Sequence, residues 1–116
     1  MFTAGGATSI SQVAAIAAMN DSRDWGKEFI KHLTENRDYA VNFINNNIPQ
    51  LHAYRPKATY LLYVDIKDLN CTAVELVDFL KKEVKLSVVP GGHNYFGNQS
   101  EGHVRICIAK EYYMKD

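Results

Sequence analysis

The apolar positions in the first half of the chain recur at helical spacing. Ser9 followed by Gln12 is a capping-box pattern, and the Ala-rich run after it predicts a short helix that ends near Asn20. Its small side chains favour a helix packed on both sides. A long second helix is expected to end within residues 45–49. The apolar face of this second helix consists of Trp25, Phe29, Leu33, Ala40, Phe43 and Ile44.

In the second half of the chain the pattern becomes strand-like. Residues 51–54 predict a short strand, residues 55–57 a turn, and residues 59–66, rich in β-branched and aromatic side chains, a longer strand. Thr72 and Glu75 form a second capping box, which begins an amphipathic helix. The apolar positions of that helix are Ala73, Leu76, Val77, Leu80 and Val84.

The last third of the chain predicts two more strands around a Gly-rich loop. Residues 86–89 form a short apolar strand that stops at Pro90, and the loop runs from there to Gly102. Residues 103–109 alternate, with Val104, Ile106 and Ile108 on one side and His103, Arg105 and Cys107 on the other. Because the apolar side must face the core, Arg105 is expected to project from the opposite face, near the Gly-rich loop.

This order of elements predicts an α+β fold, in which helices pack on one face of a small, mostly antiparallel sheet. Residues 110–116 look like the first turn of a further helix that is cut off, so we expect the sheet's domain to be truncated at its end. No internal repeat interrupts the pattern.

Composition excludes several classes of function. The 13 Lys and Arg residues balance the 13 Asp and Glu residues, so no positive field is available for nucleic acid, and an RNA-binding sheet is disfavoured. No apolar run approaches the roughly 20 residues of a membrane span. Without a secretory signal we expect a cytoplasmic protein with two reduced cysteines, Cys71 and Cys107, the latter packed as a structural thiol.

Few residues suggest chemistry by spacing alone. The four histidines lack the spacing of a metal site, and the Gly-rich loop precedes a strand, which disfavours a phosphate cradle at a helix N-terminus. Arg105 has two interpretations. It is either an ordinary solvated arginine on a half-exposed sheet, or a guanidinium that grips a carboxylate through two parallel hydrogen bonds.

Four motifs in order favour the second interpretation through resemblance to a known family. They are ATYLLYVD at 58–65, LSVVPG at 86–91, FG at 96–97 and EGHVRIC at 101–107. Together they resemble the C-terminal part of class I and II aminotransferases, most strongly the branch that includes cystathionine β-lyase-like enzymes. The segment TSISQVAA at 8–15 resembles the helix that follows the cofactor lysine in that family.

The resemblance implies a pyridoxal 5'-phosphate (PLP) enzyme of the aspartate aminotransferase fold, a homodimer acting on amino acids and 2-oxo acids. Residues 1–20 would end a large domain, and residues 21–116 would form the C-terminal small domain. Arg105 matches the family's arginine for the substrate α-carboxylate. Tyr60 falls where the family places a residue near the substrate, although core packing explains it equally well.

The same resemblance implies that the cofactor lysine, the aspartate that pairs with the pyridine nitrogen and the phosphate-binding loop lie upstream of Thr8. We therefore expect this chain to supply the carboxylate clamp of an aminotransferase or carbon–sulfur lyase, and to be inactive alone. The alternative is a free-standing α+β module that binds a small carboxylate or amino acid in a regulatory role.

Overall fold

The structure, a computed structural model, describes residues 6–109, which divide into two units, 6–32 and 33–109. The first unit contains α1 (Ser9–Asp21) and the beginning of α2 (Arg23–Asn47). The second contains the remainder of α2, the sheet and the other helices. Because the arrangement of the two units is not determined, each is described by itself.

The predicted N-terminal helix is confirmed, but its cap is not. Thr8 is the N-cap, and its hydroxyl accepts a hydrogen bond from the Ser11 amide at 3.2 Å. The capping box assigned to Ser9 and Gln12 is therefore wrong, and the Gln12 side chain instead donates to the Ala7 carbonyl at 3.1 Å. None of the residues of α1 is buried, so packing on both sides is not seen in residues 6–109.

The predicted second helix is also confirmed, but the face that packs is different. In the second unit Val41 is buried, with Ala40 and Ile44 packed beside it. Phe43 is exposed, and so is Trp25 in the first unit, where its ring stacks on Phe29 at 5.0 Å. A helical stripe through positions 40, 41 and 44 leaves position 43 outside it, which is why Phe43 does not reach the core.

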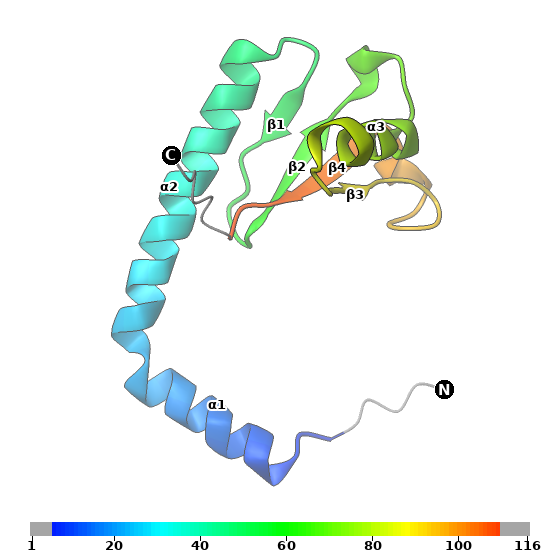
Figure 1. Cartoon of the computed structure of the whole chain (residues 1–116). Helices are drawn as coiled ribbons and strands as arrows, with labels where there is room; N and C mark the ends of the chain where they lie inside the picture. The colour runs from blue at the N-terminus through cyan, green and yellow to red at the C-terminus, as the bar shows by residue number, and fades with distance from the viewer. Residues whose placement is uncertain (1–5, 110–116) are drawn as a thin grey trace. The chain divides into compact units, whose positions relative to one another are not determined.

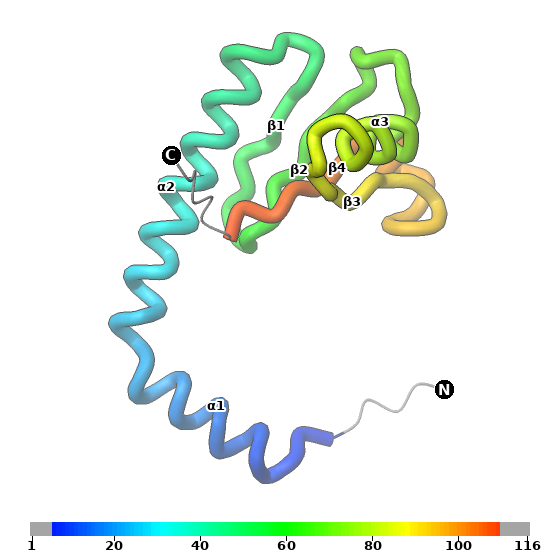
Figure 2. Tube along the Cα trace, viewed as in Figure 1, coloured from blue at the N-terminus to red at the C-terminus, as the bar shows by residue number. Residues whose placement is uncertain are grey.

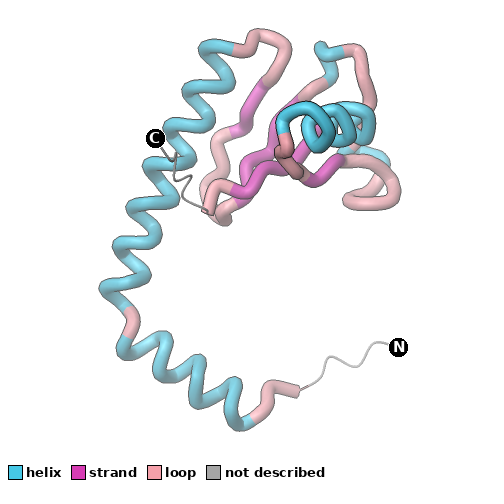
Figure 3. Tube along the Cα trace, viewed as in Figure 1, coloured by secondary structure: helices cyan, strands magenta, loops and turns pink. Residues whose placement is uncertain are grey.

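Four antiparallel strands form the sheet, in the order β1-β2-β4-β3 (Figures 1 and 3). They are β1 (His52–Tyr54), β2 (Leu61–Asp65), β3 (Val89–Pro90) and β4 (His103–Cys107). β4 therefore has a paired strand on each side. Figure 2 shows the long return of the chain between β2 and β4, which contains α3 (Ala73–Phe79) and β3.

The core lies on one face of this sheet, between the strands and the helices. β2 and β4 contribute Leu62, Val64 and Val104, while α2 and α3 contribute Val41 and Ala73. The remaining buried apolar residues are Ala53, Ile66, Val88 and Ile108. This arrangement confirms the predicted α+β fold with helices on one face of an antiparallel sheet.

α3 begins at the predicted capping box and ends differently from the prediction. The Thr72 hydroxyl accepts from the Glu75 amide at 3.2 Å, and the Glu75 carboxylate accepts from the Thr72 amide at 2.8 Å, which lowers the pKa of Glu75. After Phe79 the chain continues as a wider π-helical turn over Leu80–Val84. The changed period leaves Val84 exposed, so the prediction that it packs is wrong.

Two strand ends also differ from the prediction. β2 begins at Leu61 because Thr59 has a φ of 72°, which is incompatible with an extended strand. β3 contains only Val89 and Pro90, and Pro90 pairs with Val104 instead of ending the strand before it. A proline is tolerated there because β3 is the edge strand and needs no donor on its open side.

Polar side chains from α2 form hydrogen bonds to the backbone of the sheet, at the edge strand β1 and beyond the end of β4. The Asn45 amide group donates to the Ala53 carbonyl at 3.1 Å, while its carbonyl accepts from the Ala53 amide at 2.8 Å. These two bonds take the place of a neighbouring strand at β1. Asn36 similarly donates to the Ile108 carbonyl at 2.9 Å, just beyond the end of β4.

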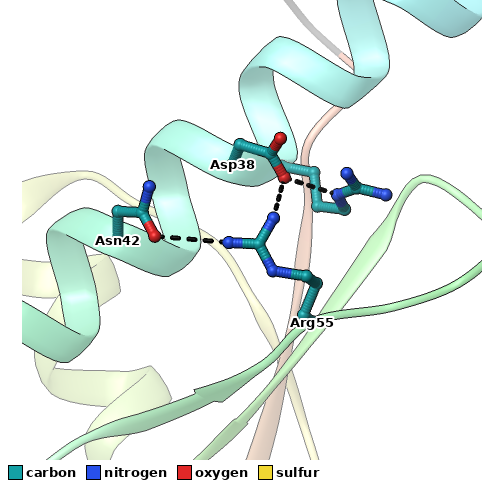
Figure 4. Close-up of polar contacts among 4 residues, drawn as sticks. Asp38, Asn42 and Arg55 are labelled. Carbon is teal, nitrogen blue, oxygen red and sulfur yellow. Dashed lines mark hydrogen bonds and ion pairs between the residues drawn. The ribbon is translucent and has the colours of Figure 1, made fainter.

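A charged group ties α2 to the turn after β1 (Figure 4). The Asp38 carboxylate forms ion pairs with Arg55 and with Arg37, the latter at 2.8 Å, and Arg55 also donates to Asn42 at 3.3 Å. The hydrogen bond from Arg37 is the main cause of the lowered pKa of Asp38. Position 55 was predicted as a turn only, so this role was missed.

Among residues 6–109, no helix combines the length and the apolar composition that crossing a membrane requires.

Candidate functional site

The face of the sheet opposite the core carries a polar and aromatic surface. In register, His52, Asp65 and His103 form one row across β1, β2 and β4. Tyr54, Tyr63, Arg105 and Val89 form the next row. Because side chains alternate along each strand, these residues lie on the face away from the helices. The predicted alternation of residues 103–109 is thus confirmed.

Arg105 is the one residue of this surface whose charge lacks a partner among residues 6–109. Its Nε atom is buried without a hydrogen bond, and no ion pair to the guanidinium is present in that part of the chain. Its Cζ atom lies 4.1 Å from the centre of the Phe96 ring. Buried donors are nearly always paired in proteins, so the orphaned Nε and the unpaired charge mark Arg105 as the unsatisfied polar group of this surface.

The loop that carries Phe96 is held closed by one buried serine. The Ser100 hydroxyl accepts a hydrogen bond from the Gly92 amide at 2.7 Å and lies 2.7 Å from the Gly97 carbonyl, to which it donates. Gly92 and Gly97 also form an isolated bridge across the loop. The loop therefore has a defined shape, and Phe96 extends from its tip over β4.

Gly91 allows this loop to lie directly against β4. A Cβ atom at this position would be 1.9 Å from the Ser100 carbonyl oxygen and 2.8 Å from that of His103. The Gly91 amide donates to the His103 carbonyl at 2.8 Å. The glycine is needed here for close approach of two backbone segments, one of the two reasons that glycine-rich loops arise.

His103 is buried on the polar face, where alternation alone predicted exposure. Its exposed fraction is 8%, because its ring stacks on Tyr63 with centroids 4.7 Å apart and planes 10° apart. Nδ1 lies 3.0 Å from the Glu101 carbonyl, so Nδ1 carries the proton and donates it. The stack fixes Tyr63, which is the direct cross-strand neighbour of Arg105.

Asp65 supplies the negative charge nearest to this stack, but it is already engaged. The Lys67 amide donates to its Oδ1 at 2.9 Å, and the Lys67 ammonium and His103 Nε2 each lie 3.6 Å from Oδ2. The amide bond is the main cause of the lowered pKa of Asp65, and the two side chains add to it. Asp65 is therefore an internal anchor and leaves Arg105 available to an external anion.

The other two highlighted residues, Tyr60 and Cys107, are both exposed. Tyr60 lies outside β2 with an exposed fraction of 50%, and in residues 6–109 its side chain forms no hydrogen bond or ring contact with Arg105. Cys107 is a free thiol on the same face as Arg105. It is exposed, so the prediction of a packed thiol is wrong.

Sequence reasoning identified Arg105 and missed the residues around it. Alternation within β2 is the signal that assigns Tyr63 and Asp65 to the same side of the sheet. Phe96 belongs to the FG motif at 96–97, which does not indicate its contact with Arg105. Its position depends on a loop with φ values of 119° at Gly92 and 88° at Gly97, which hydrophobic patterning does not encode.

Residues 6–109 do not themselves fit a PLP site or a metal site. Every lysine in this part of the chain is exposed, whereas an amine that forms an imine with a cofactor needs a protected site that lowers its pKa. In the same residues no group of three or more His, Cys, Asp or Glu side chains is arranged to hold a metal ion. The arrangement offers one chemical capacity, the binding of an anion by Arg105.

The chain is similar to part of several known enzymes. No family model matches the chain. It is 32% identical over 114 residues to an aspartate aminotransferase of Pyrococcus abyssi, across 97% of this chain and 28% of that protein. The aromatic aminotransferase of Pyrococcus horikoshii is 31% identical, with a TM-score of 0.75, and this match covers 88% of this chain and 27% of that one.

A PLP-bound carbon–sulfur lyase from Staphylococcus hominis has a TM-score of 0.73 and 28% identity over 88% of this chain and 27% of its own. The chain is homologous to part of the PLP-dependent aminotransferases and carbon–sulfur lyases. It spans about a quarter of the length of these relatives. The resemblance of the four motifs is thus confirmed, and the fold is that of a segment of these enzymes.

Proposed function

We propose that Arg105 binds the α-carboxylate of an amino acid or 2-oxo acid in a PLP-dependent aminotransferase or carbon–sulfur lyase of which this chain forms a part. The observation that carries the proposal is the guanidinium on the open face of the sheet, with its Cζ atom over the Phe96 ring and without an anionic partner in residues 6–109. A positive charge in that state is ready to bind an anion.

The chemistry of the Arg105 side chain is suited to binding a carboxylate. A guanidinium is planar, stays charged at any physiological pH and presents parallel donors that match the two oxygens of a carboxylate. The Arg105 backbone is held by β2 on one side and β3 on the other, which gives the donors a fixed origin. A rigid strand suits this task because small displacements of a positioned substrate reduce reaction rates steeply.

The cofactor's chemistry is assigned to residues outside 6–109. When bound, PLP acts as an electron sink for the substrate carbanion, while protein groups bind and orient the amino acid. Because no described lysine fits the cofactor, we expect the isolated chain to bind carboxylates weakly and to show no transaminase activity. Tyr60 near the substrate and homodimer formation remain predictions from the resemblance, and a cytoplasmic location remains a prediction from the sequence alone.

The direct test is titration of the 116-residue chain with pyruvate, followed by NMR at the backbone amides of residues 103–107, which are present in both the unaltered chain and Arg105→Lys. We expect saturable shifts, and binding about tenfold weaker in Arg105→Lys, which loses the two-pronged geometry of a charged hydrogen-bonded pair. Arg23→Lys is the matched control, since Arg23 lies in the other unit and, among residues 6–109, donates only to the Met19 carbonyl. Unchanged pyruvate binding in Arg105→Lys would contradict the proposal.

A second experiment tests the expected inactivity. The purified chain is mixed with PLP, an amino acid and a 2-oxo acid, and the new amino acid is measured. We expect no more product than PLP forms without protein. Transamination above that level would show that a cofactor site exists in this chain. It would contradict the proposal that the residues for cofactor chemistry lie outside 6–109.

One observation favours a second candidate, a free-standing carboxylate-binding module. Residues 33–109 enclose a core of nine buried apolar residues of their own. Calorimetry separates the two. A complete module would bind an amino or 2-oxo acid tightly and unfold in one cooperative transition, whereas part of an enzyme would bind weakly and self-associate through its exposed apolar surfaces.

A further inference from the structure

Phe96 is half exposed at the tip of a loop, yet it makes a specific contact. Its exposed fraction is 45%, and its ring lies under the Arg105 guanidinium at 4.1 Å. Tyr95, the preceding residue, is exposed to 52% and has no such contact within residues 6–109. Two adjacent aromatic residues of the same loop therefore have different surroundings, and only Phe96 faces the charged group.

The loop restricts where Phe96 can go. Three glycine positions shape it: Gly91 lies against the Ser100 carbonyl, while Gly92 and Gly97 have φ values of 119° and 88°. The buried Ser100 hydroxyl then joins the two ends of the turn through Gly92 and Gly97. Phe96 is thus fixed between two constrained segments and does not extend freely into solvent.

The guanidinium has little else to hold its orientation. Its Nε is buried without a hydrogen bond, and Tyr63 and Val89, its neighbours in register on β2 and β3, offer no carboxylate. The nearby Asp65 carboxylate is engaged by Lys67 and His103. A long arginine side chain without such partners normally samples many rotamers, and ordering it upon ligand binding costs free energy.

We propose that Phe96 is a positioning residue for Arg105, holding the guanidinium over its ring so that the terminal donors face a carboxylate before that ligand arrives. The inference rests on the proposed function of Arg105 and adds a second residue to it. Stacking suits this task because an aromatic face attracts the cation without using any of its hydrogen-bond donors. An aspartate at the same place would fix the guanidinium but occupy the donors.

The stacking can be measured without any ligand. The chain contains four arginines, so the spectrum of a 15N-arginine-labelled sample contains four Nε–H signals, and Arg105→Lys identifies the relevant one. We expect the Arg105 signal to be displaced by the ring current of Phe96. It should return to the position of a solvated arginine in Phe96→Leu and stay displaced in Phe96→Tyr, which retains an aromatic face.

The ligand experiment uses pyruvate as the probe. We expect Phe96→Leu to bind it about two- to fivefold more weakly than the unaltered chain, the range set by an exposed cation–aromatic contact. Phe96→Tyr should restore most of the loss. Tyr95→Leu is the matched control, because it removes an equally exposed aromatic ring from the same loop and should change neither the Arg105 signal nor the affinity.

The outcomes separate the two proposals. An Arg105 signal that is the same in the unaltered chain and in Phe96→Leu would overturn the positioning role, regardless of the measured affinity for pyruvate. A displaced signal that Phe96→Leu abolishes, with no pyruvate binding to either protein, would support the stacking and contradict the carboxylate clamp. Because Phe96 is half exposed, we expect Phe96→Leu to fold, and the three other arginine signals report whether it does.

Discussion

Replacing Gly91 with alanine tests how the loop that carries Phe96 is joined to the sheet. The new Cβ would lie 1.9 Å from the Ser100 carbonyl oxygen, whereas ordinary contacts begin at 3.4 Å, so one backbone segment must retreat by 3.4 − 1.9 = 1.5 Å. Such a shift breaks the bond from the Gly91 amide to the His103 carbonyl and that from the Gly92 amide to Ser100.

Both of these hydrogen bonds are in a buried region, where each lost partner leaves a desolvated polar group. At about 1–2.5 kcal/mol for each bond, Gly91→Ala should lower the free energy of unfolding by about 2–5 kcal/mol. Most domains are stable by only about 5–15 kcal/mol, so the loss should be large relative to the total. Urea unfolding followed by far-UV circular dichroism measures it through the midpoint and slope.

Two other glycines serve as controls for the steric argument. Gly97 has open space around its Cβ position but a φ of 88° and a ψ of 168°, a region populated almost only by glycine, so Gly97→Ala should cost only the backbone strain, about 1–3 kcal/mol. Gly26 lies in α2 with nothing nearby, so Gly26→Ala should not destabilise the chain. A Gly91→Ala protein as stable as Gly97→Ala would refute the close-contact explanation.

Two further substitutions test the polar anchors. Asn45→Ala removes both hydrogen bonds to the buried Ala53 and should cost about 2–3 kcal/mol in urea unfolding, while Asn47→Ala, which loses one exposed bond, should cost less than 1 kcal/mol. The Lys67 amide lowers the pKa of Asp65, so the stability from Asp65 is present above the pKa of the unfolded chain and is lost as pH falls through the lower, folded value. Asp65→Asn should flatten this acid dependence, and identical pH profiles would contradict it.

Patterning predicted the parts of the fold that the core enforces. The alternation of residues 103–109 predicted which side of this segment faces the core, since Val104 and Ile108 must be buried, and the Thr72–Glu75 box predicted the start of α3. Periodicity failed where polar groups decide the packing. On α2, the polar Asn45 bonds to β1 while the apolar Phe43 is exposed. The spacing of apolar residues along the helix does not predict that a polar residue contacts the sheet and an apolar one does not.

The candidate site likewise contains one residue that the sequence pattern predicts and one that it does not. Arg105 could be located from sequence because its strand has a strict period of two, whereas Phe96 could not, because its place depends on a turn closed by Ser100. Long-range contacts made by a loop depend on backbone angles and on single hydroxyl bonds. Neither leaves a periodic signal in the sequence, so the positioning of the guanidinium became visible only in three dimensions.

The orientation of Arg105 follows from how the core is built around β4. This strand pairs with β2 on one side and β3 on the other, and Val104, next to Arg105, is buried. A slip of one residue in register would turn every side chain to the other face, burying the guanidinium and exposing Val104. The free energy of burying the apolar side therefore also fixes the direction of the charged side. In this segment, the stability of the sheet and the direction of the proposed carboxylate clamp have the same physical origin.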